Sequence, residues 1–254
     1  MVHGRPPGWG ITLKTIKEEN IYWFVLLGVI TLLAIGTYHR NSLWRGELAL
    51  WQDCIKKSPG KARPHHNLGF VHYGLEQWDD AKREFEEALR LNPFYSLSLY
   101  NLGMISYRKG FIAQAIDYYQ KAIALDPKFA DSFYNLGIAY KKKGLYQEAI
   151  ESYRRFLIYK PAYKNAHNSL GLAYKSLRKR DEAIRSFQEE LRCHPENAYA
   201  HVYLGDIYME IGEYATSIAH YKKALAHANM PEAERIRQTI ISIKTRKKGR
   251  AQEN

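Results

Sequence analysis

The sequence predicts an all-α solenoid of stacked helical hairpins, preceded by one transmembrane helix. Three observations lead to this prediction. A 34-residue pattern recurs five times without a slipped residue, each copy carries two amphipathic helical stripes, and an uncharged apolar stretch lies near the N-terminus. Such hairpins are too small to bury their stripes alone, so we expect each one to pack against its neighbours rather than around one central core.

The third copy, residues 130–163, shows the unit. In its first half, apolar and small residues follow the i, i+3, i+4, i+7 spacing of one helix face: Phe133, Leu136, Gly137 and Tyr140. The second half repeats this kind of spacing at Ala149, Ile150, Tyr153 and Leu157. Gly144 breaks the first helix and Pro161 ends the second. The two stripes need each other, which predicts a hairpin.

The same landmarks recur every 34 residues. The Leu-Gly pair stands at Leu68-Gly69, Leu102-Gly103, Leu136-Gly137, Leu170-Gly171 and Leu204-Gly205. A small residue follows at Ala81, Ala115, Ala149, Ala183 and Ser217, and an aromatic four residues later at Phe85, Tyr119, Tyr153, Phe187 and Tyr221. A proline closes four copies, at Pro93, Pro127, Pro161 and Pro195. With this pattern, residues 62–231 resemble the tetratricopeptide repeat family.

The resemblance implies a right-handed superhelix whose first helices line a concave surface. Its five repeats would be residues 62–95, 96–129, 130–163, 164–197 and 198–231. Residues 232–254 follow as a capping helix, with Ile236, Ile240 and Ile243 near helical spacing. They end in a basic tail, which is either a solvated end or a contact to an anionic membrane surface or nucleic acid.

Composition limits the function classes. The formal net charge of +12 favours acidic partners, anionic lipid headgroups or nucleic acid, without choosing among them. The two cysteines, Cys54 and Cys193, have no metal-like spacing, so neither a disulfide framework nor a zinc site is indicated. No phosphate-cradling loop and no zinc-protease helix motif is present. We therefore expect no enzyme activity, no catalytic residues, no metal and no cofactor.

The N-terminal part predicts a membrane anchor. Residues 1–20 are a polar segment, and residues 21–38 contain no charged residue. At ~1.5 Å per residue the apolar stretch spans roughly 27 Å, close to the hydrocarbon thickness of a bilayer. Tyr22, Trp23 and Tyr38 stand at its ends, where aromatic belts form. A cleaved signal peptide is the rival interpretation, but the residues that follow, from Thr37 to Arg40, make a poor cleavage site.

Residues 39–61 read as a degenerate half repeat, because Trp51 and Pro59 stand 34 residues before Phe85 and Pro93. This junction resembles that of transmembrane-and-tetratricopeptide proteins and their bacterial relatives. The matching residues are Arg40-Asn41, Trp44, Glu47, Leu50-Trp51, Pro59 and Arg63. Basic residues on the two sides of the span do not decide its orientation. The orientation therefore comes from the resemblance alone, which implies repeats on the periplasmic or lumenal side. Those relatives have many spans, so no catalytic activity carries over to a chain with one.

The candidate binding residues occupy concave positions that packing does not require. Asn67, Asn101 and Asn135 hold the sixth position of three successive repeats. A row of amides can pair with the backbone of an extended peptide, and this row resembles the asparagine ladder of O-linked N-acetylglucosamine transferase. The alternative is that asparagine is simply common at this position. Aromatic, apolar and basic residues surround the row: Phe70, Tyr100, Met104, Tyr107, Arg108, Tyr134, Lys141, Lys142 and Lys175.

These features predict a membrane-anchored protein–protein interaction scaffold that binds a peptide segment of a partner in the concave groove. An accessory subunit of a glycan-transfer or export system is one alternative, suggested by the junction. Nucleic-acid binding through the basic surface is another, although the Leu-Gly packing and the membrane anchor argue against it. Self-association by end-to-end stacking of solenoids is a third.

Overall fold

The computed structural model describes residues 13–226 and 233–252, and every regular element in them is a helix, from α1 to α12. The predicted all-α architecture of helical hairpins is confirmed. The chain divides into two compact units, residues 1–91 and residues 92–254.

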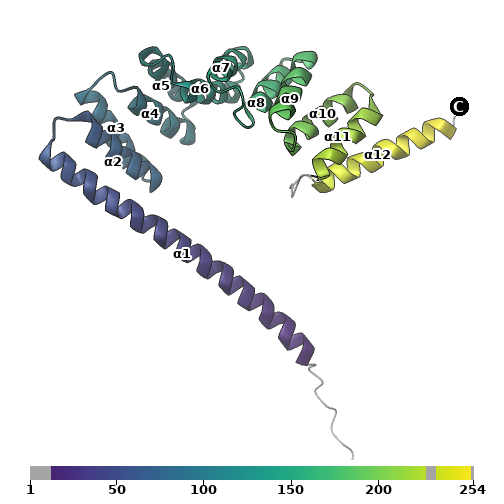
Figure 1. Cartoon of the computed structure of the whole chain (residues 1–254), viewed down its shortest axis with the longest axis horizontal. Helices are drawn as coiled ribbons and strands as arrows, with labels where there is room; N and C mark the ends of the chain where they lie inside the picture. Colours follow the sequence, from purple (N-terminus) through teal and green to yellow (C-terminus); the bar gives the residue numbers. More distant parts are fainter. Residues whose placement is uncertain (1–12, 227–232, 253–254) are drawn as a thin grey trace, which may run out of the picture. The chain divides into compact units, whose positions relative to one another are not determined.

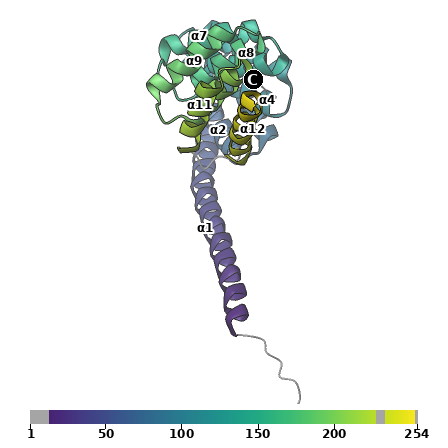
Figure 2. The same cartoon turned by 90° about the vertical axis from the view of Figure 1, so that its right-hand side faces the viewer.

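Unit 1 contains α1 (Leu13–Lys57), α2 (Ala62–Gly74) and α3 (Trp78–Leu91). The end of α1 contacts α2, and α2 packs along α3 to form the first hairpin. Figures 1 and 2 show α1 as one continuous helix. The predicted half repeat is thus not a separate element but the last part of α1, where Trp51 and Ile55 are half-buried.

The predicted helix over residues 21–38 lies inside α1. All residues from Tyr22 to Tyr38 are exposed, so this stretch packs against no other helix of the described chain. Within residues 13–226 and 233–252, no helix is both long enough and apolar enough to cross a membrane. The helix is therefore confirmed, whereas its crossing of a membrane stays a prediction.

Unit 2 contains the remaining helices: α4 (Ser96–Arg108), α5 (Ile112–Leu125), α6 (Ala130–Lys143), α7 (Tyr146–Tyr159), α8 (Ala166–Ser176), α9 (Arg180–Cys193), α10 (Ala198–Glu210), α11 (Tyr214–Ala226) and α12 (Ala233–Gln252). They pack in chain order: α4 on α5, α5 on α6, and so on through α11 and α12 (Figure 1). The first helices of successive repeats also meet, α4 with α6 and α6 with α8. These three helices form one wall of unit 2.

The Leu-Gly pair is explained by a close approach between the two helices of a hairpin. A Cβ atom on Gly137 would lie 2.7 Å from Cε1 of Tyr153, a ring that is fully buried. Gly144 ends α6 with a φ of 83°, a left-handed conformation that glycine adopts at little cost. Gly144 therefore ends the first helix as the sequence predicts, and Gly137 lets the two helices of the hairpin approach closely.

At the C-terminal end, α12 lies against the fifth repeat. Its Ile236, Ile240 and Ile243 are buried in one cluster with Val202 and Tyr221. The side chains of the basic tail (Lys244, Arg246, Lys247, Lys248 and Arg250) lie outside the described residues. The apolar side of α12 thus covers apolar residues of α10 and α11.

Candidate functional site

The predicted binding residues fall in both units. Asn67 is half-buried and Phe70 is 48% exposed, both on α2 in unit 1. The other ten lie on α4, α6 and α8 in unit 2. The structure therefore relates Asn101 to Asn135, but it does not place Asn67 in line with them. The row of three asparagines stays a prediction.

Two hydrogen bonds join the first helices of successive repeats. The Nδ2 of Asn135 donates to the hydroxyl of Tyr100 at 2.8 Å. One repeat further on, the hydroxyl of Tyr134 and Oγ of Ser169 lie 3.2 Å apart, and either can be the donor. Both contacts link the fifth position of one repeat to the sixth position of the next. These two hydrogen bonds thus fix the positions of the polar side chains on α4, α6 and α8 relative to one another.

The asparagines are not equally accessible. Asn101 is 5% exposed, so most of its amide is covered, whereas Asn135 is half-buried. An asparagine amide has two N–H donors and one acceptor oxygen, and Tyr100 takes one donor of Asn135. Asn135 is therefore the better placed of the two for a peptide backbone.

The tyrosines of this wall are fixed by neighbouring rings. Tyr100 packs edge-on against Phe129, with ring centroids 4.8 Å apart. Tyr134 meets Phe156 at 4.9 Å, and burial raises the pKa of its hydroxyl. Rigid aromatic side chains that are half-exposed lose little conformational entropy when a partner covers them. These rings belong partly to the core and partly to the surface that a partner can reach.

Met104 and Tyr107 are half-buried, like Tyr100 on the same helix. Both pack against the cluster of Ala115, Ile116 and Tyr119, on the α5 side of α4. Tyr100 packs against the same cluster, so all three side chains contact the core and stay partly accessible. The role of Met104 and Tyr107 in binding stays a prediction.

The basic residues of the set differ in their surroundings. Arg108 and Lys142 are exposed, while Lys141 is half-buried and burial lowers its pKa. Lys175 forms an ion pair with Glu210 of the next repeat, with Nζ and Oε1 3.0 Å apart. A ligand carboxylate would meet Lys141 and Lys142 directly but would have to compete with Glu210 for Lys175.

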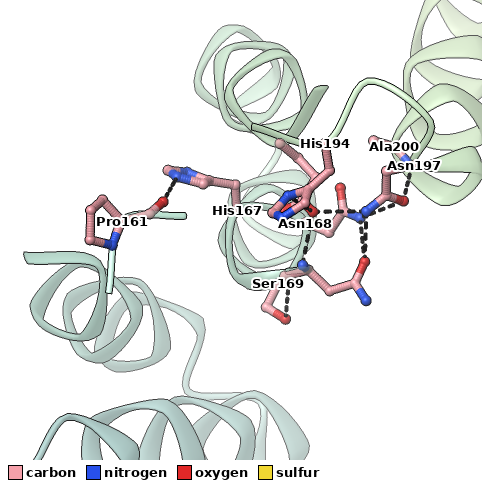
Figure 3. Close-up of polar contacts among 9 residues, drawn as sticks. Pro161, His167, Asn168, Ser169, His194, Asn197 and Ala200 are labelled. Carbon is pink, nitrogen blue, oxygen red and sulfur yellow. Dashed lines mark hydrogen bonds and ion pairs between the residues drawn. The ribbon is translucent and has the colours of Figure 1, made fainter. Parts of the chain in front are cut away.

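The structure reveals a buried polar cluster that the sequence analysis missed. Its centre is Glu190 on α9, whose side chain is fully buried. The Oε1 of Glu190 accepts hydrogen bonds from the backbone N–H of Asn165 and from Nδ2 of Asn197, both at 2.8 Å. Figure 3 shows the side chains of Asn168, His194 and Asn197 converging at this point. The cluster ties the loop before α8 to the loop before α10.

This cluster is only partly satisfied. Nδ1 of His194 lies 3.2 Å from Oε1 of Glu190, but the two atoms do not have hydrogen-bond geometry. Among the described residues, Oε2 of Glu190 and Oδ1 of Asn168 have no hydrogen-bond partner. A sequence signal was available, because the equivalent position is alanine in three repeats: Ala88, Ala122 and Ala224.

The cluster is not a metal centre by composition. No group of three or more histidine, cysteine, aspartate or glutamate residues in the described part of the chain could hold a metal ion. Three of the five residues in the cluster are asparagines, which in unit 2 act as donors and caps. Asn197, for example, caps α10 by accepting the backbone N–H of Ala200. The geometry of the cluster around Glu190 indicates a structural role.

Family models match four stretches of the chain. Models described as tetratricopeptide repeat match residues 62–95, 130–161 and 168–233, and one described as TPR repeat matches residues 103–144. Together these stretches cover most of the repeated region. The chain belongs to the tetratricopeptide repeat family. The family resemblance drawn from the Leu-Gly pattern is confirmed.

Solved tetratricopeptide repeat structures share this fold. MamA is 27% identical, with a TM-score of 0.61, and the likeness covers 63% of this chain and 94% of that one. YrrB, described as a TPR protein with an unusual peptide-binding site, is 20% identical over 72% of this chain and 94% of its own, with a TM-score of 0.65. A thermophilic TPR protein of Thermus thermophilus is 25% identical over 72% and 99%, with a TM-score of 0.50. YrrB supports the fold alone.

One curated relative is a Caenorhabditis elegans protein named Protein O-mannosyl-transferase F38B6.6. It is 34% identical over 67 residues, which is 26% of this chain. The chain spans only about 10% of the length of that relative. The likeness is therefore limited to a small part of a much longer protein. The predicted resemblance of residues 39–61 to the junction of transmembrane relatives stays a prediction.

Proposed function

We propose that this tetratricopeptide repeat protein is a membrane-anchored scaffold that binds an extended peptide segment of a partner along α4, α6 and α8. The observation that carries the proposal is the pair of inter-repeat contacts, Tyr100 to Asn135 and Tyr134 to Ser169. They set polar groups at a regular spacing along the wall. A regular row of fixed donors and acceptors suits the regular backbone of an extended peptide.

The side chains around this row support binding. Tyrosine and arginine are enriched among the residues that contribute most energy to protein interfaces. Tyr100 and Tyr134 are half-exposed, and Arg108 and Lys142 are exposed at the C-terminal ends of the same two helices. With a net charge of +12 on the whole chain, the favoured ligand is a segment that carries aspartate or glutamate.

The proposed anchor is residues 21–38. A helix that is apolar on all sides is either buried in a protein or inserted in a bilayer. Here every side chain from Tyr22 to Tyr38 is exposed, including Leu32 at 71% and Leu33 at 66%. Water is a poor solvent for so long an apolar surface. A bilayer supplies the missing partner, and the junction resemblance favours the periplasmic or lumenal side for the repeats.

The second candidate function is an accessory subunit of a glycan-transfer system. The observation that favours it is the 34% identity to a protein named O-mannosyl-transferase over 67 residues. In that case the repeats would bind a subunit of the membrane complex rather than a soluble partner. Both candidates use the same wall, and they differ in the partner.

The test is affinity capture with the full-length chain, extracted in mild detergent, followed by identification of bound proteins and nucleic acids. Capture is then repeated with Tyr100→Ala, Tyr134→Ala, and with Arg154→Ala on α7 as a matched surface control. Partners that depend on both tyrosines but not on Arg154 support the groove. Recovery of RNA or DNA, or of partners insensitive to both tyrosines, would contradict it. Recovery of membrane glycan-transfer subunits would select the second candidate.

A further inference from the structure

Unit 2 has a hollow that the groove does not use. It has a volume of about 610 Å³ and lies between α5, α6 and α7. Its walls are mainly apolar and aromatic: Ile123, Phe133, Leu136, Tyr140 and Tyr159. Ligand sites in proteins commonly measure roughly 300–1,000 Å³ and have such linings.

The hollow and the groove lie on different sides of α6. Successive residues of an α-helix turn by about 100°. Phe133, Leu136 and Tyr140 therefore lie within about 60° of one another around α6, while Tyr134 and Lys141 are turned by roughly 120° from the middle of that face. A ligand in the hollow would leave the groove accessible.

Contacts between two repeats hold the hollow open. Nε2 of Gln120, in the second repeat, donates to the hydroxyl of Tyr140 at 2.8 Å. The hydroxyl of Tyr159 donates to the carbonyl of Pro127 at 3.2 Å. The ring of Tyr159 also stacks on Phe133, with centroids 6.4 Å apart and planes 18° apart. A ligand would thus find its site formed in advance, which reduces the entropy cost of binding.

The small side chain of Ser152 leaves space in the wall of the hollow. Ser152 on α7 lines the hollow and is 5% exposed. Its Oγ donates to the backbone oxygen of Glu148 at 2.8 Å, so this hydroxyl is satisfied without water. Leu136, which is 6% exposed, is a buried apolar residue of the lining. The buried part of the lining therefore suits an apolar side chain.

Negative charge lies at the rim. Glu148 and Glu151 both line the hollow, together with Arg155. Arg155 forms an ion pair with Glu151, with Nε and Oε1 3.0 Å apart. In the described part of the chain, no ion pair involves Glu148. Burial raises the pKa of the Tyr140 hydroxyl, the hydrogen bond from Gln120 lowers it, and the charge of Glu148 raises it. One uncompensated carboxylate remains there on an otherwise basic protein.

We propose that the hollow is a second docking site, which takes an aliphatic or aromatic side chain of a partner protein whose neighbouring lysine or arginine pairs with Glu148. The apolar lining accepts the side chain, and the rim selects the charge beside it. This site is independent of the groove, so one chain could hold two segments at once.

The test uses the full-length chain in lipid nanodiscs and two probes, the blocked peptides acetyl-Phe-Leu-Lys-amide and acetyl-Phe-Leu-Glu-amide. Binding is followed by the NMR shift of the Ile123 methyl group. We expect the lysine peptide to bind more tightly. Glu148→Lys should weaken it about threefold to fivefold and reverse the preference, as expected for an ion pair near a surface.

A second variant tests the cavity. Ser152→Leu should fill the hollow and weaken both peptides at least tenfold. The fourth repeat supplies matched controls, because Ser186 and Glu182 make the same 2.8 Å contact there as Ser152 and Glu148. Ser186→Leu and Glu182→Lys should change neither affinity. Because Glu148 is exposed, its variant keeps the test valid even if Ser152→Leu fails to fold.

Three results would overturn the proposal. The first is no Ile123 shift with either peptide. The second is equal binding of the two peptides, or equal effects from the controls in the fourth repeat. The third is a self-association of the chain that Glu148→Lys abolishes while neither peptide binds, which would assign the hollow to a second copy.

Discussion

Asn135 and Tyr100 are bonded across two successive repeats, with the amide nitrogen and the phenol oxygen 2.8 Å apart. The asparagine at the sixth position therefore has a structural partner in the preceding repeat. The amide of Asn135 donates one N–H to Tyr100. Its second N–H and its acceptor oxygen remain for hydrogen bonds to a ligand. Variants can separate the two roles.

Replacing Asn135 by alanine should weaken binding of a groove peptide and also destabilise unit 2. Each lost hydrogen bond costs about 1 kcal/mol, or roughly a fivefold change in an equilibrium constant. Tyr100→Phe removes the same inter-repeat bond but leaves the amide in place. It should lower the urea midpoint to a similar degree without the loss of affinity. If both variants bind as tightly as the parent, Asn135 serves packing alone.

The triple variant Asn67→Ala, Asn101→Ala, Asn135→Ala tests the predicted row. Three amides at about 1 kcal/mol each would give roughly a hundredfold loss of affinity. Because Asn101 is 5% exposed, we expect its single replacement to affect stability more than binding. Isothermal titration of each single variant and of the triple variant measures the contributions. A loss no larger in the triple variant than in Asn135→Ala would reduce the row to one residue.

Gly137→Leu should unfold the middle of unit 2. Its Cβ would already lie 2.7 Å from the buried Tyr153 ring, and overpacking of this kind costs about 1–3 kcal/mol or more. A Cβ on Gly60 meets nothing within 4 Å, so Gly60→Leu is the control and should melt like the parent. Thermal melting by circular dichroism compares the two. A parent-like melting curve for Gly137→Leu would mean that the hairpin can open to accept a side chain.

Glu190→Ala should destabilise the fourth repeat although alanine is common at this position. The backbone N–H of Asn165 and the amide of Asn197 would lose their acceptor, which costs about 1–3 kcal/mol for a buried group. Glu190→Gln keeps one acceptor oxygen and removes the carboxylate, so we expect a smaller loss. Urea unfolding of both variants is the measurement. Equal stability of Glu190→Ala and the parent would show that water replaces the carboxylate.

His66 should make unit 1 sensitive to acid. Burial lowers the pKa of its imidazole from 6.5 to about 4, so the unfolded chain binds a proton more readily than the folded chain. Its contribution is therefore fully present above pH 6.5 and is lost as the pH falls towards 4, by about 3 kcal/mol in all. His66→Tyr copies Tyr100 and Tyr134, which hold the same position. Urea midpoints at pH 7 and pH 5 should differ less in this variant than in the parent.

The anchor is tested by extraction. The intact chain should stay with membranes in alkaline carbonate, and the double variant Leu27→Lys, Ile30→Asp should be released, because each charge in a bilayer core costs about 2.5–3.5 kcal/mol. Protease added to spheroplasts should digest the repeats if they face the periplasm. Release of the parent by carbonate, or a mature N-terminus near His39, would contradict the anchor.

The repeat period predicted the hairpins, because their contacts lie within one unit of sequence, but it did not predict that the Tyr153 ring meets Gly137 inside one hairpin. It did not predict the bond between Asn135 and Tyr100, since a position in a repeat says which wall a residue faces but not which neighbour it meets. Glu190 was not predicted because it departs from the repeat pattern, at a position that is alanine in three other repeats. The hollow beside Ser152 depends on side chains from three helices, which no local pattern combines.

The buried cluster around Glu190 also bears on how the array can be edited. Its members all belong to the fourth repeat, residues 164–197, and Asn197 in turn caps the helix that opens the fifth. Moving this repeat elsewhere would carry the buried carboxyl group and Asn197 together, so the helix that follows in the new place would begin after the same cap residue. Deleting it would leave α10 to start from a different loop. The fourth repeat is therefore a self-contained unit, and recombination would be tolerated best where it keeps residues 164–197 together, because a break inside it would separate Glu190 from Asn165 or Asn197.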